Sequence, residues 1–231
     1  MNLRTALKLG RVSNLPTVWT NVLAGVALAS LEPRWRVVLP VGVAVSLLYV
    51  AGTYLNDAFD AGWDAAHRAG RPIPAGEVTA RAVFQAGFGM MAAALIVLAV
   101  ATNTRTLVVG FVLAGLIVVY DLSHKGKRHA PALLGLCRAG VYGVAASATG
   151  TFAPPVVVGA FFLFGYLMLL SAIARQERTN PKLPRLVARL VAGISLVDGV
   201  QLLAIGQPWI ALGCAGAFWL TLSLQSRVAG S

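Results

Sequence analysis

Three aspartates close an apolar stretch of the chain at a spacing that suits metal chemistry. Asp57, Asp60 and Asp64 lie at positions i, i+3 and i+7, so a helix would place them on one face, with Asn56 one turn from Asp60. Such carboxylates repel one another, and a helix C-terminus disfavours negative charge. Oxygen ligands suit Mg²⁺, which takes one or two carboxylates with phosphate oxygens and water. We therefore predict that these four residues bind Mg²⁺; a solvated acidic helix end is the alternative.

Basic residues follow the aspartates in two loops. Arg71 lies in a Gly- and Pro-rich loop that returns the chain to the next apolar stretch. Lys125, Lys127 and Arg128 form a cluster in a later loop. Binding of a diphosphate requires both a metal site and basic residues, because a metal bridges some phosphate oxygens while basic groups bind the rest. We predict that these four residues bind a diphosphate, although topology alone also places positive charge in such loops.

Long apolar stretches must position these residues. The 231 residues are 58% hydrophobic and 12% charged, too apolar for one soluble core. Lipid must solvate most of that surface, and a helix satisfies its own backbone hydrogen bonds there. Alternation with period two, the mark of a barrel, is absent. The sequence predicts an all-α, polytopic transmembrane bundle of about eight spans, near 15–30, 36–57, 81–101, 106–122, 132–149, 154–174, 184–205 and 207–225.

Positive charge is distributed unevenly between the two sides of this bundle. One side collects most of the Lys and Arg residues, and the other holds only Arg34, Arg36 and Arg105. Cytoplasmic loops retain positive charge, so we assign both termini and the acidic site to the cytoplasmic face. The net charge of +11 lies in short loops and forms no basic domain, which argues against nucleic acid as a partner. Arg11 and Asn14 precede the first span and are candidates for the border of the site, and Arg11 is equally an orientation signal.

These motifs resemble those of the UbiA superfamily of intramembrane prenyltransferases, and the resemblance covers most of the chain. The family motif Asn-Asp-x-x-Asp-x-x-x-Asp is matched in full by the acidic residues above, and the following Arg-Pro-Ile-Pro-x-Gly loop is similar to residues 71–76. A later Tyr-x-x-x-Lys-Arg type loop is matched loosely by Tyr120, Lys125, Lys127 and Arg128. The resemblance implies a single domain over residues 1–231.

The resemblance also implies an activity. A UbiA-like bundle has a cavity that opens at the cytoplasmic membrane face, where Mg²⁺ holds a prenyl diphosphate. Mg²⁺ and basic groups would stabilise the leaving diphosphate while an aromatic or other lipophilic acceptor attacks the allylic carbon. The expected protein is thus a Mg²⁺-dependent prenyltransferase of the bacterial inner membrane, with Asp57, Asp60 and Asp64 as its catalytic residues.

One departure from the family matters. Its second aspartate motif is missing from the stretch 164–177, where Glu177 is the sole acid and Arg175 adds a positive charge. We take Glu177 as a further metal ligand and Arg175 as a further diphosphate-binding residue. The pattern is similar to an EboC-like branch associated with natural-product biosynthesis. One-metal chemistry and loss of catalysis are both open, and the alternative function is a non-catalytic protein that binds or carries an amphipathic metabolite.

Polar residues inside the spans have two interpretations. Arg138 needs a partner in the membrane, so it pairs with Asp121 or reaches the cavity, and we favour the pairing. Asp198 and Gln201, one turn apart, line the pocket or hydrogen-bond another helix, and we favour the second role. A transporter that relays ions through Arg138 and Asp198 is a more distant alternative, because paired repeats are not visible.

Overall fold

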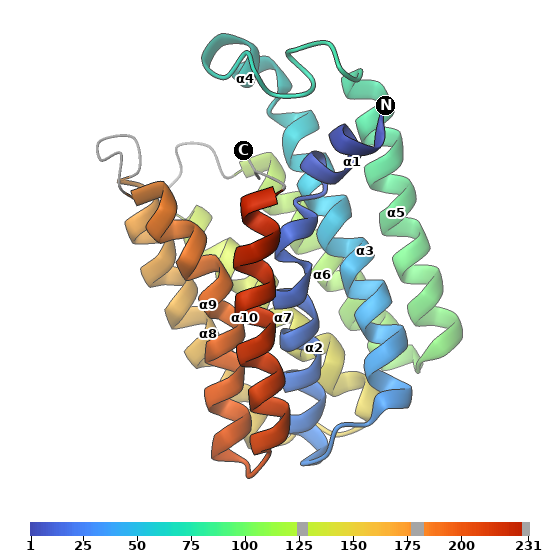
Figure 1. Ribbon diagram of the computed structural model, residues 1–231. Coiled ribbons are helices and arrows are strands. Elements are labelled where there is room, and N and C mark those ends of the chain that lie inside the picture. Colours follow the sequence, from blue (N-terminus) through green and yellow to red (C-terminus); the bar gives the residue numbers. More distant parts are fainter. Residues whose placement is uncertain (124–128, 177–182, 228–231) are drawn as a thin grey trace.

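The computed structural model describes residues 1–123, 129–176 and 183–227, and their regular structure is entirely helical. This confirms the predicted all-α bundle (Figure 1). The elements in chain order are α1 (Leu3–Leu9), η1 (Val12–Asn14), α2 (Leu15–Ser30), α3 (Trp35–Phe59), α4 (Ala61–His67), α5 (Ala80–Ala101), α6 (Thr104–Ser123), α7 (Ala130–Thr149), α8 (Pro154–Ala174), α9 (Leu183–Ala204) and α10 (Pro208–Arg227).

The eight predicted spans all form helices, with ends within two residues of the expected ones. Seven of the described helices, α3 and α5 to α10, are long and apolar enough to cross a membrane. The exception is α2, whose 16 residues extend about 24 Å at 1.5 Å per residue, short of a hydrocarbon core of about 30 Å. Most of its residues are nevertheless buried, because α2 packs against α3, α7, α9 and α10.

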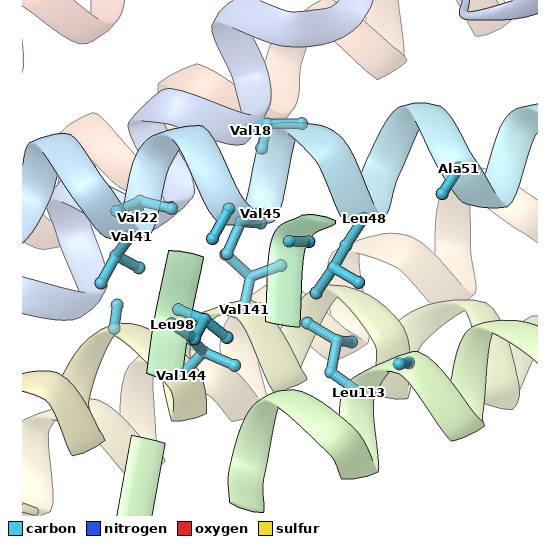
Figure 2. Packing of buried hydrophobic residues seen from close by; sticks show 14 of the residues in the cluster. Val18, Val22, Val41, Val45, Leu48, Ala51, Leu98, Leu113, Val141 and Val144 are labelled. Atoms are coloured by element: carbon cyan, nitrogen blue, oxygen red, sulfur yellow. The ribbon is translucent and has the colours of Figure 1, made fainter. Parts of the chain in front are cut away.

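Two apolar cores share α2. The first joins α2 to α3, α5, α6 and α7 and includes Val22, Val41, Leu98 and Val144 (Figure 2). The second joins α2 to α7, α8, α9 and α10. Figure 1 accordingly shows α2 in the middle of the bundle, between α10 and α3. Residues on α2 are therefore well placed to connect the two halves.

The outer faces of the helices are apolar. Val100, Phe161 and Ile96 are 83%, 72% and 63% exposed, which is the pattern of a surface solvated by lipid. The protein is thus an integral multi-pass membrane protein. The N-terminus, the C-terminal end of α10 and α4 lie at one end of the bundle (Figure 1). That end also holds Asp57, Asp60 and Asp64, and we call it the acidic end.

Candidate active site

The acidic stripe, formed by Asp57, Asp60 and Asp64, continues across the junction between α3 and α4. α3 ends at Phe59, and Asp60 keeps helical backbone angles that lead into α4. The backbone N–H of Asp60 donates to Asn56 O at 3.0 Å, and that of Asp64 donates to Asp60 O at 2.9 Å. Asp57, Asp60 and Asp64 are only 5%, 7% and 1% exposed. They therefore do not form a solvated helix end, the alternative that the sequence had left open.

Arg71 lies between two of these carboxylates. Its Nη1 donates to Asp57 Oδ1 and to Asp64 Oδ2, each at 3.0 Å, and the side chain is buried. The loop that carries it is stabilised by the backbone N–H of Glu77, which donates to Pro72 O at 2.9 Å. Arg71 thus lies beside the acidic stripe, and its role in binding a diphosphate stays a prediction.

Arg11 approaches the same cluster from the N-terminal segment. It links α1 to η1 with φ 42° and ψ 43°, the left-handed region that a non-glycine residue rarely adopts. Its Nη2 donates to Asp57 Oδ1 at 3.3 Å. A strained backbone at such a position commonly persists at a functional site, because the surrounding contacts enforce it. Of the two roles considered for Arg11, the structure shows the one at the border of the site.

The sequence analysis did not assign Asp121 to the site. Asp121 lies in the last turn of α6 and is 4% exposed, and the Asn56 amide Nδ2 donates to its Oδ1 at 3.3 Å. This contact brings a fourth aspartate to the acidic end. The available signal was an aspartate at the end of an apolar span, next to a tyrosine and before a basic loop.

A cavity of about 260 Å³ extends from this cluster into the bundle. Arg11, Asn14, Asn56 and Asp121 lie on its wall near the acidic end. Most of the remaining wall is apolar and comes from α2, α3, α6, α7, α8 and α9, with residues such as Val18, Val45, Leu48, Leu113, Ile117, Val141, Leu167 and Ile194. The site is therefore a polar mouth on an apolar pocket, a form suited to a ligand with a charged head and an apolar body.

Arg138 also lines the cavity, deeper in α7. Its Nη1 donates to Asn21 Oδ1 at 2.9 Å, and its guanidinium carbon lies 5.4 Å from the centre of the Tyr49 ring. The second interpretation of Arg138, a position in the cavity, is thus the one that the structure shows. Its hydrogen bond goes to α2, whereas the sequence analysis had considered Asp121 as a partner.

Asp198 connects α9 to α2 and α7. It is completely buried, accepts from Asn21 Nδ2 through both oxygens at 3.0 and 2.8 Å, and accepts from the Tyr142 hydroxyl at 2.5 Å. Gln201 Nε2 donates to that hydroxyl at 3.3 Å. The favoured interpretation of Asp198 and Gln201, hydrogen bonding to other helices, agrees with these contacts.

Other predicted residues do not join the cluster or cannot be placed. Lys125, Lys127, Arg128 and Glu177 lie outside the described residues. Arg175 is the exposed C-cap residue of α8. Residues 164–176, the described part of the stretch 164–177, contain no Asp or Glu.

The donor set fits a divalent cation in part. Within the described ranges, no group of three or more His, Cys, Asp or Glu side chains is gathered so that it could hold a metal by itself. Arg71 lies between Asp57 and Asp64 and donates a hydrogen bond to each of them. However, Asp64 Oδ1 is buried and has no hydrogen-bond partner among the described residues, and an unmatched buried carboxylate oxygen favours a cation. Mg²⁺ needs only one or two carboxylates when phosphate and water complete its shell, so these residues fit it.

Comparisons with known proteins identify the family. The chain is 27% identical over 164 residues to a 4-hydroxybenzoate octaprenyltransferase of Idiomarina loihiensis; the match covers 70% of this chain and 48% of that relative, about half its length. A solved digeranylgeranylglyceryl phosphate synthase superposes with a TM-score of 0.66 at 17% identity, over 99% of this chain and 98% of that one. A UbiA homologue from Archaeoglobus fulgidus, solved with GPP and Mg²⁺, gives 0.64 at 15% identity over 96% and 88%. The model of the UbiA prenyltransferase family matches residues 17–228, and the chain therefore belongs to that family.

Proposed function

We propose that this protein transfers an isoprenyl group from a prenyl diphosphate to a lipophilic, aromatic acceptor, with Mg²⁺ as cofactor. The observation that carries the proposal is an apolar cavity whose wall includes Arg11, Asn56 and Asp121, next to the buried carboxylates of Asp57 and Asp64, to which Arg11 and Arg71 donate. A prenyl diphosphate has the complementary form, with a charged head that binds a metal and basic groups, and a chain that needs an apolar pocket.

The acidic residues hold the cation in this proposal. Asn56, Asp57, Asp60 and Asp64 are the ligands at the mouth, and Glu177 is a further ligand. Bound Mg²⁺ supplies positive charge that stabilises the diphosphate as it leaves. Among the described residues, Arg11 and Arg71 donate to Asp57 and Asp64, Asn56 donates to Asp121, and Asp60 is a fourth buried carboxylate. Negative charge is in excess there, so a cation would stabilise the cluster.

The basic residues orient the donor. Arg71 can exchange its carboxylate partners for phosphate oxygens, to which guanidinium groups bind as a fork. Arg175, Lys125, Lys127 and Arg128 complete the diphosphate site. As the allylic carbon–oxygen bond breaks, the electron pair leaves with the diphosphate, and these groups stabilise its growing charge. The apolar wall around Val45, Leu48 and Ile117 keeps water from the allylic carbon until the acceptor attacks.

The relatives support the substrate class. The Archaeoglobus fulgidus homologue was solved with DMAPP and Mg²⁺ and with GPP and Mg²⁺, and the Idiomarina loihiensis relative is named for 4-hydroxybenzoate. We extend these ligands to the present chain as part of the proposal. We further propose that residues 1–231 form a single domain and that the acidic end faces the cytoplasm from the bacterial inner membrane. The proposal also places the protein in the EboC-like branch.

One feature favours a second candidate function. The end of α8 lacks the aspartates expected of a second metal site, and Arg175 stands there instead. A protein that binds a prenyl diphosphate or another amphipathic metabolite without turnover would need only the first acidic motif. Product formation separates this candidate from the enzyme.

Calorimetric binding of geranyl diphosphate to the detergent-purified protein tests the proposal, with Mg²⁺ in one sample and EDTA in the other. We expect binding that requires Mg²⁺, followed by release of diphosphate when 4-hydroxybenzoate or another aromatic acceptor is added. Inorganic diphosphate serves as the control for the apolar pocket and should bind more weakly. Mg²⁺-dependent binding without product across an acceptor screen would favour the carrier, and a folded sample that binds in neither condition would exclude the donor site.

A further inference from the structure

A further apolar cluster joins α1 to the loop 71–78, which carries Arg71. Its buried members come from α1, α3 and α5: Leu9, Tyr54, Ala58 and Val83. Ile73 and Val78 of the loop pack against them. The N-terminal helix and the loop therefore share one small core at the acidic end, next to the buried carboxylates.

A side-chain hydrogen bond fastens this loop to α1. Thr5 Oγ1 donates to Glu77 Oε2 at 2.5 Å, and Thr5 is only 1% exposed. The backbone N–H of Glu77 donates in turn to Pro72 O at 2.9 Å. A short series of hydrogen bonds thus runs from α1 to the residue that follows Arg71 in the chain.

The same helix holds the segment that carries Arg11. The Tyr54 hydroxyl of α3 donates to Ala6 O of α1 at 3.1 Å. Arg11 follows α1 with its left-handed φ of 42°, a conformation that persists only where surrounding contacts enforce it. Both guanidinium groups that donate to Asp57, those of Arg11 and Arg71, are therefore carried by segments that α1 holds in place.

An anchor outside the acidic cluster matters most when a diphosphate binds. The ion pairs of Arg71 with Asp57 and Asp64 hold the loop from inside the site. When Arg71 exchanges these partners for phosphate oxygens, the ion pairs no longer fix the loop. The hydrogen bond between Thr5 and Glu77 takes no part in that exchange and still holds it. A guanidinium group whose backbone is already fixed loses less conformational freedom on binding, so the anchor should raise the affinity.

We propose that α1 is a positioning element of the diphosphate site and that Thr5, through Glu77, fixes Arg71. The proposal rests on the prenyl-transfer function above. α1 and η1 precede residues 17–228, the part of the chain that matches the family model, so that match assigns them no role. The ligand group that they serve is the diphosphate head, whatever chain it carries.

Two donors that share this head test the anchor. Calorimetry gives the Mg²⁺-dependent affinities of dimethylallyl diphosphate and geranyl diphosphate for the wild type and for Thr5→Val, which keeps the side-chain shape and removes the hydroxyl. We expect both affinities to fall about tenfold, because a hydrogen bond to a charged group no longer holds the loop. Both should fall by the same factor, since only the shared head contacts Arg71.

The outcomes separate this proposal from the proposed function. Unchanged affinities in a folded Thr5→Val variant, or a loss confined to geranyl diphosphate, overturn the positioning role. A wild-type protein that binds neither donor would instead overturn the proposed function.

Two further substitutions distinguish positioning from general stability. Thr5→Ser keeps the hydroxyl and should bind both donors nearly as the wild type does; a loss equal to that of Thr5→Val overturns the role of the hydrogen bond. Thr102→Val is the matched control, because the Thr102 hydroxyl donates to Leu98 O at 2.5 Å at the opposite end of the bundle. It should change neither affinity, and a loss equal to that of Thr5→Val overturns the positioning role.

Glu77→Ala tests the same hydrogen bond from the exposed loop, and it serves if Thr5→Val does not fold. It should weaken both donors as much as Thr5→Val does. The double variant Thr5→Val/Glu77→Ala should lose no more than either single variant, because both changes remove one interaction. Additive losses would mean that the two residues act separately, which overturns the anchor.

Discussion

Nη1 of Arg71 lies 3.0 Å from Asp57 Oδ1, although 14 residues separate the two in the chain. The same nitrogen donates to Asp64, so one guanidinium compensates two buried carboxylates. Arg71 therefore occupies the space between groups to which we assign a metal. In this arrangement Arg71 and the cation compensate the same negative charge, and a diphosphate would allow both to bind at once.

Removal of Arg71 should make the protein more dependent on Mg²⁺. In Arg71→Ala the buried Asp64 loses its cationic partner and Asp57 keeps only Arg11, a change that typically destabilises a protein by about 3–5 kcal/mol. We expect a lower unfolding temperature without metal, and a larger rise on addition of Mg²⁺ than in the wild type. Thermal unfolding in detergent with Mg²⁺ or EDTA measures this, with exposed Arg105→Ala as the matched control. Equal Mg²⁺ shifts in variant and wild type would contradict a cation site at these carboxylates.

Asp60→Ala should abolish Mg²⁺-dependent binding of geranyl diphosphate and leave the bundle folded. Asp60 is the residue that joins α3 to α4, and its backbone hydrogen bonds do not need its carboxylate. Calorimetry gives the affinity, and circular dichroism reports the helix content. Glu32→Ala, an exposed acid at the opposite end, is the control and should bind like the wild type. Unchanged binding in Asp60→Ala would remove the metal role that we assign to it.

Sequence periodicity predicted the helices well because lipid imposes long apolar segments with clear ends. The stripe of Asp57, Asp60 and Asp64 was equally legible, since it depends on neighbours along one helix. The contacts of Asp121 and Asn21 could not be predicted from the sequence, because they depend on which helices pack together. The sequence alone does not show that α2 contributes residues to both apolar cores. Long-range pairing of this kind requires the three-dimensional arrangement.

Arg11 should contribute to donor binding at the expense of local backbone strain. Its left-handed φ of 42° costs of order 1 kcal/mol or more for a non-glycine residue, and glycine removes that cost. We expect Arg11→Gly to weaken geranyl diphosphate binding about tenfold, because a charged hydrogen bond is lost, with little loss of stability. Leu31→Gly is the matched control, since Leu31 also has a positive φ, 59°, but lies at the opposite end. It should raise stability slightly and leave binding unchanged; a similar loss of binding in both variants would contradict the role of the guanidinium.

Close contact between α2 and α7 should be required for the Arg138 network as well as for stability. A Cβ atom at Gly25 would lie 2.8 Å from Ala145 Cβ and 3.0 Å from Tyr142 Cα, so Gly25→Leu must push the helices apart, at a cost of about 1–3 kcal/mol. Gly25 lies one turn from Asn21, on the same face of α2. The displacement should therefore loosen the hydrogen bonds around Asp198. Gly216→Ala meets no atom within 4 Å and should unfold at the wild-type temperature or slightly above it, because alanine favours the helix. Thermal unfolding of both variants measures the difference, and a wild-type unfolding temperature in Gly25→Leu would contradict the close contact between α2 and α7.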